Sequence, residues 1–269
     1  MSKYNIFFKI YKDRDLIMQL TKRERQMRHK GSRLGNLWAL ISPCMMLGLY
    51  LFIFGFIFKS RFGVIPNETF FDFALAMFLG LSIFNLISET ISSSPNIIIS
   101  QPNYVKKVVF PLYILSICKV LTSLYFTLVS ILICCVLIPF SSTQINFKAF
   151  IYLPIILLPL IIICLGLSWG IAAIGVFYRD LNHLTGFIST SLMYASAIVY
   201  APAKLPLQIF KYLKYNPILL IVDQFRKLLL WNNNINISDL IIIYIISIII
   251  FMSGYYTFKT LKPYFAEVI

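Results

Sequence analysis

The chain has 269 residues, of which 59% are hydrophobic and only 13% are charged, and its mean hydropathy is +0.82. This composition excludes an ordinary soluble domain and predicts that most of the chain lies in lipid. The net charge of +14 is also found in nucleic-acid-binding proteins, but ten of the 24 Lys and Arg residues precede Gly35, beside the first apolar run. We therefore attribute the charge to membrane topology and anionic membrane lipids, and expect no nucleic-acid partner.

Residues 1–33 mix apolar and basic side chains in a pattern that predicts an amphipathic helix in the inner headgroup layer; a solvated helix is the alternative. Six Lys or Arg residues lie between Lys22 and Arg33, against the single acid Glu24. Clustered positive charge beside a span stays in the cytoplasm, so the N-terminus is expected inside. Gly31 and Gly35 are expected to let the chain turn sharply before the first span.

No charged residue occurs between Leu34 and Phe58. This run is long enough to cross a hydrocarbon core roughly 30 Å thick. Five similar segments follow, so we predict an all-α membrane protein with six transmembrane helices and both termini cytoplasmic, in one transmembrane domain covering residues 1–269. The expected spans are residues 36–58, 70–92, 109–138, 150–176, 184–201 and 240–258.

Two segments between the spans break the apolar pattern. The first contains Pro95, Pro102 and a lysine pair, and is expected to be a cytoplasmic loop with a short helix at 95–105. The second, residues 203–236, has apolar runs too short to span. Two short helices broken at Asn216-Pro217, lying on or re-entering the outer leaflet, fit it best, although its five positive charges oppose the usual charge asymmetry.

The fourth span carries Gly166 and Gly170, followed by Ala173, on one helical face. Small residues at this spacing let two helices approach closely in lipid. Two charges also lie within spans, Glu89 and Lys119. One hypothesis is that they pair with each other; the alternative is that Lys119 extends toward the surface while Glu89 faces the inner water.

The sequence is poor in enzyme chemistry. Its two histidines and five cysteines form no metal-ligand pattern, and no catalytic residue is expected. The sequence also lacks the GK dipeptide of an ATP-binding loop. We therefore predict that the chain is not an enzyme and that any ATP is hydrolysed by another subunit. A membrane-embedded glycosyl- or acyltransferase is the alternative from another class, but the ten acids are too scattered to favour it; a structural scaffold is a third.

Two sets of side chains have open interpretations. Tyr50, Phe54 and Phe58 share a face of the first span, where aromatic rings either stack on sugars in a conduit or simply pack. The basic residues Lys30, Arg33 and Arg179 either set topology alone or bind a lipid diphosphate headgroup.

Five segments taken together, in order along the chain, resemble the polysaccharide-exporting branch of the ATP-binding-cassette transporter permeases, and most of all the lipopolysaccharide O-antigen exporters. They are KGSRLGNLWALISP (30–43), YVKKVVFP (104–111), VFYRDLNHL (176–184), KYNPILLIVDQFRKLLL (214–230) and LKPYFAEVI (261–269). Teichoic-acid and capsular polysaccharide permeases are the near relatives.

The resemblance implies a homodimer in the bacterial inner membrane with two ATPase subunits, which bind the ATP and magnesium, beneath it. The substrate would be an O-antigen glycan on an undecaprenyl diphosphate carrier, moved between the subunits. The 95–105 helix would couple to the ATPase, and residues 203–236 would form outer gate helices. Expected coupling residues are Asn96, Ile97, Ser100, Gln101, Asn103 and Tyr104; expected gate residues are Pro206, Asn216, Pro217 and Arg226.

Overall fold

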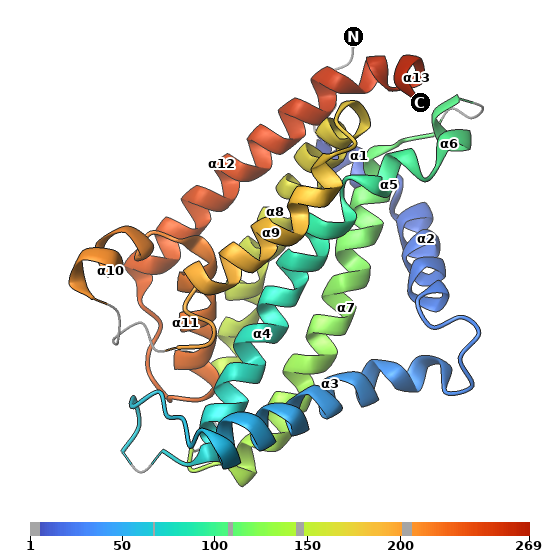
Figure 1. The fold of residues 1–269 in the computed structure, drawn as a ribbon. Coiled ribbons are helices and arrows are strands. Elements are labelled where there is room, and N and C mark those ends of the chain that lie inside the picture. The colour runs from blue at the N-terminus through green and yellow to red at the C-terminus, as the bar shows by residue number, and fades with distance from the viewer. Residues whose placement is uncertain (1–5, 67, 107–109, 144–147, 201–205) are drawn as a thin grey trace.

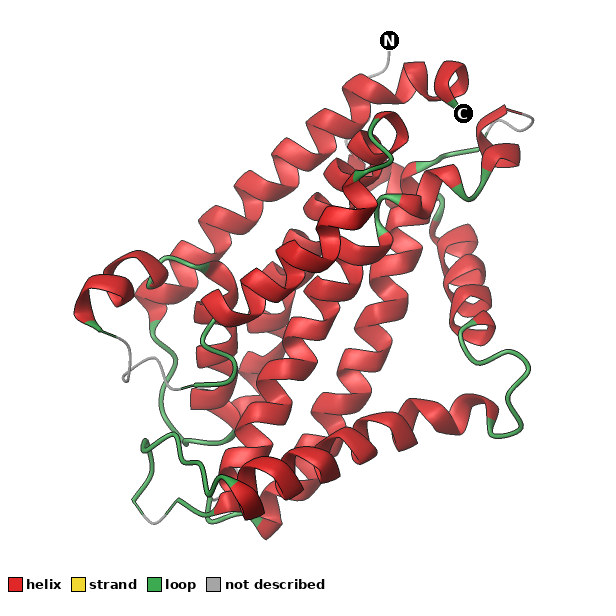
Figure 2. Ribbon diagram, viewed as in Figure 1, coloured by secondary structure: helices red, strands yellow, loops and turns green. Residues whose placement is uncertain are grey.

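The computed structural model describes residues 6–66, 68–106, 110–143, 148–200 and 206–269. Within these residues every regular element is helical and there is no strand, so the prediction of an all-α protein is confirmed (Figure 2). The start of the third expected span at residue 109 and residues 203–205 of the expected gate segment lie outside the described residues.

Figure 1 shows the order of the helices along the chain. Their bounds are α1 Ile6–Lys12, α2 Arg14–Met27, α3 Trp38–Tyr50 with its π-helical continuation η2 Leu51–Ile57, α4 Phe70–Ser93, α5 Asn96–Ile99, α6 Pro102–Lys106, α7 Tyr113–Leu137, α8 Lys148–Phe177, α9 Leu181–Ala195, α10 Leu207–Leu213, α11 Pro217–Leu229, α12 Ile237–Leu261 and α13 Phe265–Val268.

Five helical stretches among the described residues are long and apolar enough to cross a membrane, and they overlap five of the six expected spans. They are Gly35–Ile57, Phe70–Ser93, Tyr113–Phe140, Ile151–Phe177 and Ile237–Val268. The remaining expected span, 184–201, contains α9, which ends at Ala195 after 15 residues. Ala197 then takes a left-handed conformation, with φ at 49°, and turns the chain.

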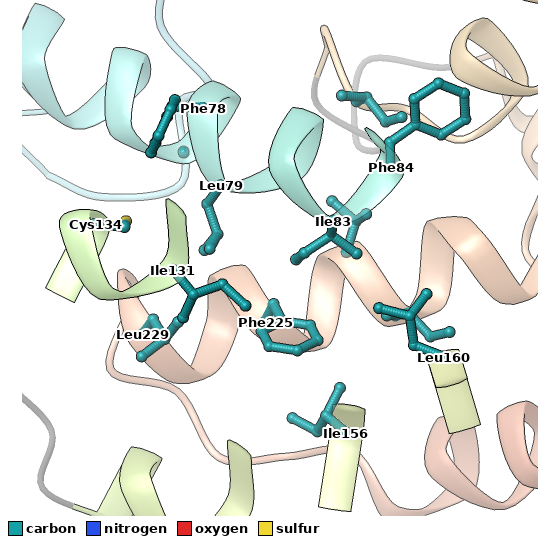
Figure 3. Packing of buried hydrophobic residues seen from close by; sticks show 14 of the residues in the cluster. Phe78, Leu79, Ile83, Phe84, Ile131, Cys134, Ile156, Leu160, Phe225 and Leu229 are labelled. Carbon is teal, nitrogen blue, oxygen red and sulfur yellow. The ribbon is translucent and has the colours of Figure 1, made fainter. Parts of the chain in front are cut away.

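Helix α4 forms the centre of the bundle. Most of its residues are buried, and α3, α7, α8, α9 and α11 all contact it. The core is built from branched aliphatic and aromatic side chains of α4, α7, α8 and α11, as Figure 3 shows around Ile83 and Phe225. By contrast, α3 and α12 turn most of their apolar surface outward.

Glycines bring α8 and α12 into backbone contact. A Cβ atom added to Gly254 of α12 would lie 1.9 Å from the carbonyl oxygen of Gly166, and one added to Gly166 would lie 2.6 Å from the oxygen of Ile250. Gly170 faces the Gly254 Cα. The close approach expected from the small residues of the fourth span is therefore present, and α12 is the partner helix.

Helix α2 packs lengthwise on α7. Near the start of α2, the Sγ of Cys118 on α7 donates to the backbone carbonyl of Ile17. At the end of α2, the guanidinium of Arg28 lies over the ring of Phe126. Gly31 and Gly35, with φ of 90° and 47°, turn the chain at the loop that follows, as expected. Helix α3 then crosses α4 and α7 at a steep angle (Figure 1).

Candidate functional site

A cavity of about 450 Å³ lies between α3, α4 and α7, with the end of α2 at one side. Its lining combines aromatic rings with hydroxyl and amide groups. The lining residues are Arg28, His29, Trp38, Ala39, Ser42, Pro43, Met46, Tyr50, Phe78, Leu81, Ser82, Asn85, Ser88, Glu89, Ser123, Phe126, Thr127 and Ser130. We call it the α3–α4–α7 cavity.

The polar groups reach the cavity because they repeat at helical spacing. Ser82, Asn85 and Ser88 are three residues apart on α4, and Ser123, Thr127 and Ser130 follow a similar spacing on α7. Residues three or four apart lie on one helix face, so each set forms a polar stripe along an otherwise apolar span. The two stripes face the same space and add polar groups to its largely apolar wall.

Two buried polar atoms at this cavity have no hydrogen-bond partner among the described residues. They are the Ser123 hydroxyl, in a residue only 1% exposed, and the Nε2 of His29. An unsatisfied buried polar group costs free energy unless water or a ligand satisfies it. Neutral hydroxyls beside aromatic rings suit a hydroxyl-bearing ligand such as a sugar, which can hydrogen-bond at its edge and stack on its face.

An ion pair stands at the end of the cavity nearest the chain termini. Arg28 donates to Glu89 at 2.8 Å, and its guanidinium lies 4.2 Å from the centre of the Phe126 ring. Lys119 instead donates to Glu24 of α2 at 3.3 Å. The hypothesis that Glu89 pairs with Lys119 is therefore wrong: because α2 lies along α7, Arg28 at its end and Glu24 on it supply a partner to each residue.

The expected coupling residues lie on two short helices, α5 and α6, joined at Ser100 and Gln101. A second cleft of about 450 Å³ separates them from α2 and α7. Asn96, Ile97, Ser100, Gln101 and Tyr104 border this cleft; Asn103 does not.

Helix α5 is tightly held against the end of α8. A Cβ atom on Gly175 would lie 2.7 Å from the Cα of Pro95, so only glycine fits there. The Ser94 hydroxyl donates to Ser168 at 3.1 Å. Displacement of α5 would therefore be transmitted directly to α4 and α8.

Of the three expected conduit aromatics, only Tyr50 borders the α3–α4–α7 cavity. Phe54 lies between Tyr50 and Phe58 in a continuous row of rings, with centroids 6.5 and 5.9 Å apart, but it also packs against Phe73 of α4. Phe58 is exposed at the end of the row.

Lys30 and Arg33 are exposed in the loop between α2 and α3, next to cavity-lining residues His29 and Trp38. Arg179 is also exposed, in the turn between α8 and α9. That turn lies near the top of Figure 1, below the chain termini, whereas the α2–α3 loop lies lower, at the right edge, so one subunit does not bring the three basic residues together.

The expected gate residues occupy α10, α11 and the turns around them. Pro206 is exposed before α10. Asn216 caps α11 by accepting from the backbone N–H of Ile218 at 3.0 Å, and Pro217 begins that helix. Arg226, by contrast, is buried within the bundle.

The polar stripes of the cavity were not predicted from the sequence, although a signal was present. Ser82, Asn85, Ser123 and Thr127 interrupt apolar spans at intervals of three or four residues. Elsewhere the structure offers no competing metal site, since the described residues hold no group of three His, Cys, Asp or Glu side chains suited to an ion.

Comparison with known proteins decides the family. A family profile described as "ABC-2 type transporter" matches residues 15–230, most of the chain. The chain belongs to the ABC-2 type transporter family. The matched region contains α2 to α11, and so includes both the cavity and the α5–α6 segment.

Curated relatives of this ABC-2 transporter chain match it over nearly its whole length. Two proteins named O-antigen export system permease protein RfbA, from Klebsiella pneumoniae, are 26% and 25% identical, and each match covers 99% of this chain and 98% of the relative. A protein of the same name from Myxococcus xanthus is 24% identical, with 96% of both chains covered.

Proposed function

We propose that this chain is the transmembrane permease subunit of an ATP-driven exporter, and that it moves an O-antigen polysaccharide carried on undecaprenyl diphosphate across the bacterial inner membrane. The observation that carries the proposal is the full-length similarity to proteins named O-antigen export permeases. The hydroxyl-lined cavity supports it, because a polar polymer needs polar and aromatic groups along an otherwise apolar bundle.

The proposed assembly is a homodimer with two cassette ATPase subunits, which bind ATP and magnesium. The outward apolar faces of α3 and α12 leave surface for lipid and for a second subunit. Helices α5 and α6 face the ATPase, and the tight contact of α5 with α8 suits this segment to transmit movement. In this arrangement α9 supplies the sixth crossing, α10 and α11 form the outer gate, and both termini are cytoplasmic.

Within this function, Lys30 and Arg33 are proposed to receive the lipid diphosphate at the mouth of the α3–α4–α7 cavity. Both are exposed in the loop that connects the cavity-lining residues His29 and Trp38, and charge-assisted hydrogen bonds from Lys and Arg suit a diphosphate. The separation of Arg179 restricts this proposed site in a single subunit to the first two residues.

Deletion of the gene in its host tests the function. We expect the surface polysaccharide to disappear and the lipid-linked glycan to accumulate on the cytoplasmic side of the inner membrane. Restoration by a plasmid copy, but not by one carrying K30Q and R33Q together, would support the headgroup site. Unchanged surface polysaccharide in the deletion strain would contradict the proposed function.

A further inference from the structure

Arg226 is a buried charge on a proposed gate helix, away from the α3–α4–α7 cavity lining and from the proposed headgroup residues. It lies on α11 and is only 1% exposed. The neighbouring charges on the same helix, Asp223 and Lys227, pair with each other at 2.7 Å. Burial lowers the pKa of the Arg226 guanidinium to about 10, so the group remains charged at neutral pH.

The guanidinium is held by backbone carbonyls from two other parts of the bundle. It donates to the oxygen of Ala76 in α4 at 2.9 Å, and to those of Ala197 and Ile198 at 3.1 and 2.6 Å. The ring of Phe62 covers it, with 4.6 Å between the guanidinium carbon and the ring centroid. No carboxylate pairs with it among the described residues.

The space for this arrangement is provided by a glycine. A Cβ atom on Gly80 of α4 would lie 2.6 Å from Nη2 of Arg226. Any larger residue at position 80 must therefore displace the guanidinium or the helix. The site accommodates an arginine fork and little else.

Two of the carbonyls that Arg226 binds, those of Ala197 and Ile198, belong to the bend that ends α9. Ala197 in this bend has a φ of 49°, a left-handed conformation that costs a residue with a side chain free energy unless its surroundings fix it. Asn216, at the start of α11, donates to the oxygen of Ala195 at 3.1 Å and to the hydroxyl of Ser196 at 3.2 Å. Side chains of α11 and its cap thus satisfy the carbonyls of Ala195, Ala197 and Ile198.

We propose that Arg226 is the positioning residue of the outer gate: it ties the bend at 195–198 to α4 and α11 and so keeps this end of the subunit closed. Its partners are neutral carbonyls, which water can replace at lower cost than it can replace a carboxylate in an ion pair. The hydrogen bonds from Arg226 therefore hold the strained bend in place and can still be broken when the gate opens. This inference rests on the proposed function, in which residues 203–236 form the gate.

The test uses the complex with its ATPase in membranes without ATP. Ile198 is fully buried, and I198C provides a thiol in the bend without altering the carbonyl that Arg226 binds. Labelling by a membrane-impermeant maleimide is measured at this thiol by mass spectrometry. The native Cys134 and Cys164, both fully buried, report loss of the fold in the same molecule.

We expect R226Q to speed labelling of I198C by on the order of tenfold, about the factor that one net hydrogen bond supplies, while Cys134 and Cys164 stay protected. R226K is expected to give a smaller increase, because a single ammonium cannot match the planar fork. G80A, which crowds Nη2 without removing the charge, should also increase labelling. K227Q, the matched control on the same helix, should not.

Continued protection of I198C in R226Q, R226K and G80A would overturn the proposal. If R226Q increased the labelling of Cys134 and Cys164 as much as that of I198C, the proposal would also be overturned, because Arg226 would then stabilise the whole fold and not the bend alone. Glycan export by the wild type is measured separately, so a failure of the proposed function is distinguishable from a failure of this inference.

Discussion

Arg28 and Glu89 are 61 residues apart in sequence, yet their side chains meet at 2.8 Å and join the end of α2 to the last turns of α4. Four residues after Glu89 the α4 helix ends, and α5 follows. The pair therefore connects the segment proposed to contact the ATPase with the hinge that leads into α3 and the cavity.

A double-mutant cycle on R28Q and E89Q is expected to give a coupling free energy of about 0.5 kcal/mol, since both side chains are partly exposed. The measurement is thermal unfolding in detergent at low salt, and the coupling should weaken in high salt. A cycle on E89Q and K119M should give coupling near zero. A larger coupling between Glu89 and Lys119 than between Glu89 and Arg28 would contradict the observed pairing.

G254A should lower the free energy of unfolding by about 2–3 kcal/mol, because the added methyl group meets the backbone of α8 and forces the helices apart. G48A is the matched control. Gly48 lies inside α3 with nothing within 4 Å of an added Cβ, so the change should be neutral or stabilising by up to about 1 kcal/mol. Equal effects of the two substitutions would show that α8 and α12 are not in backbone contact.

The Ser123 hydroxyl is expected to matter for transport through the α3–α4–α7 cavity and not for the stability of the fold. Because its hydroxyl has no partner among the described residues, S123A should leave the free energy of unfolding unchanged or raise it by up to about 1 kcal/mol. S123F should fold but lose most export, because the ring fills the cavity. L128F, on the exposed face of the same helix, should retain export. Normal export by a folded S123F protein would exclude the cavity from the transport path.

G175A should separate ATP hydrolysis from export. The added methyl group collides with Pro95 and displaces α5 from α8. We expect the purified complex to keep hydrolysing ATP while export falls several-fold, measured on the same preparation. G170A, where the added Cβ makes only ordinary contact at 3.4 Å, is the control on the same helix. If G175A leaves export per ATP unchanged, the contact between α5 and α8 does not transmit the movement.

The sequence predicted those parts of the fold that depend on local pattern. Apolar length located five of the six expected spans, and Asn216-Pro217 located the start of α11, because an asparagine cap and a first-turn proline act within a few residues. Gly166 and Gly170 indicated a close helix pair, but their partner Gly254 stands alone in an apolar run and carries no pattern of its own.

The parts that failed depend on contacts between distant segments. The partners of Glu89 and Lys119, on α2 and at its end, were not predicted, because the position of α2 along α7 cannot be derived from its amphipathic pattern. The burial of Arg226 and its hydrogen bonds could not be predicted from the sequence either, because its partners are backbone carbonyls, which every residue has. The stripe of Ser82, Asn85 and Ser88 could have been found by counting polar residues within spans.

Transport by the purified complex in proteoliposomes tests the central claim most directly. Lipid-linked O-antigen is placed in the outer leaflet of vesicles that contain this chain with the ATPase facing outward, and the glycan that becomes protected inside is measured with and without ATP. The account predicts ATP-dependent protection, lost when the ATPase is inactivated and reduced by S123F. Equal protection without ATP, or none with an active ATPase, would contradict it.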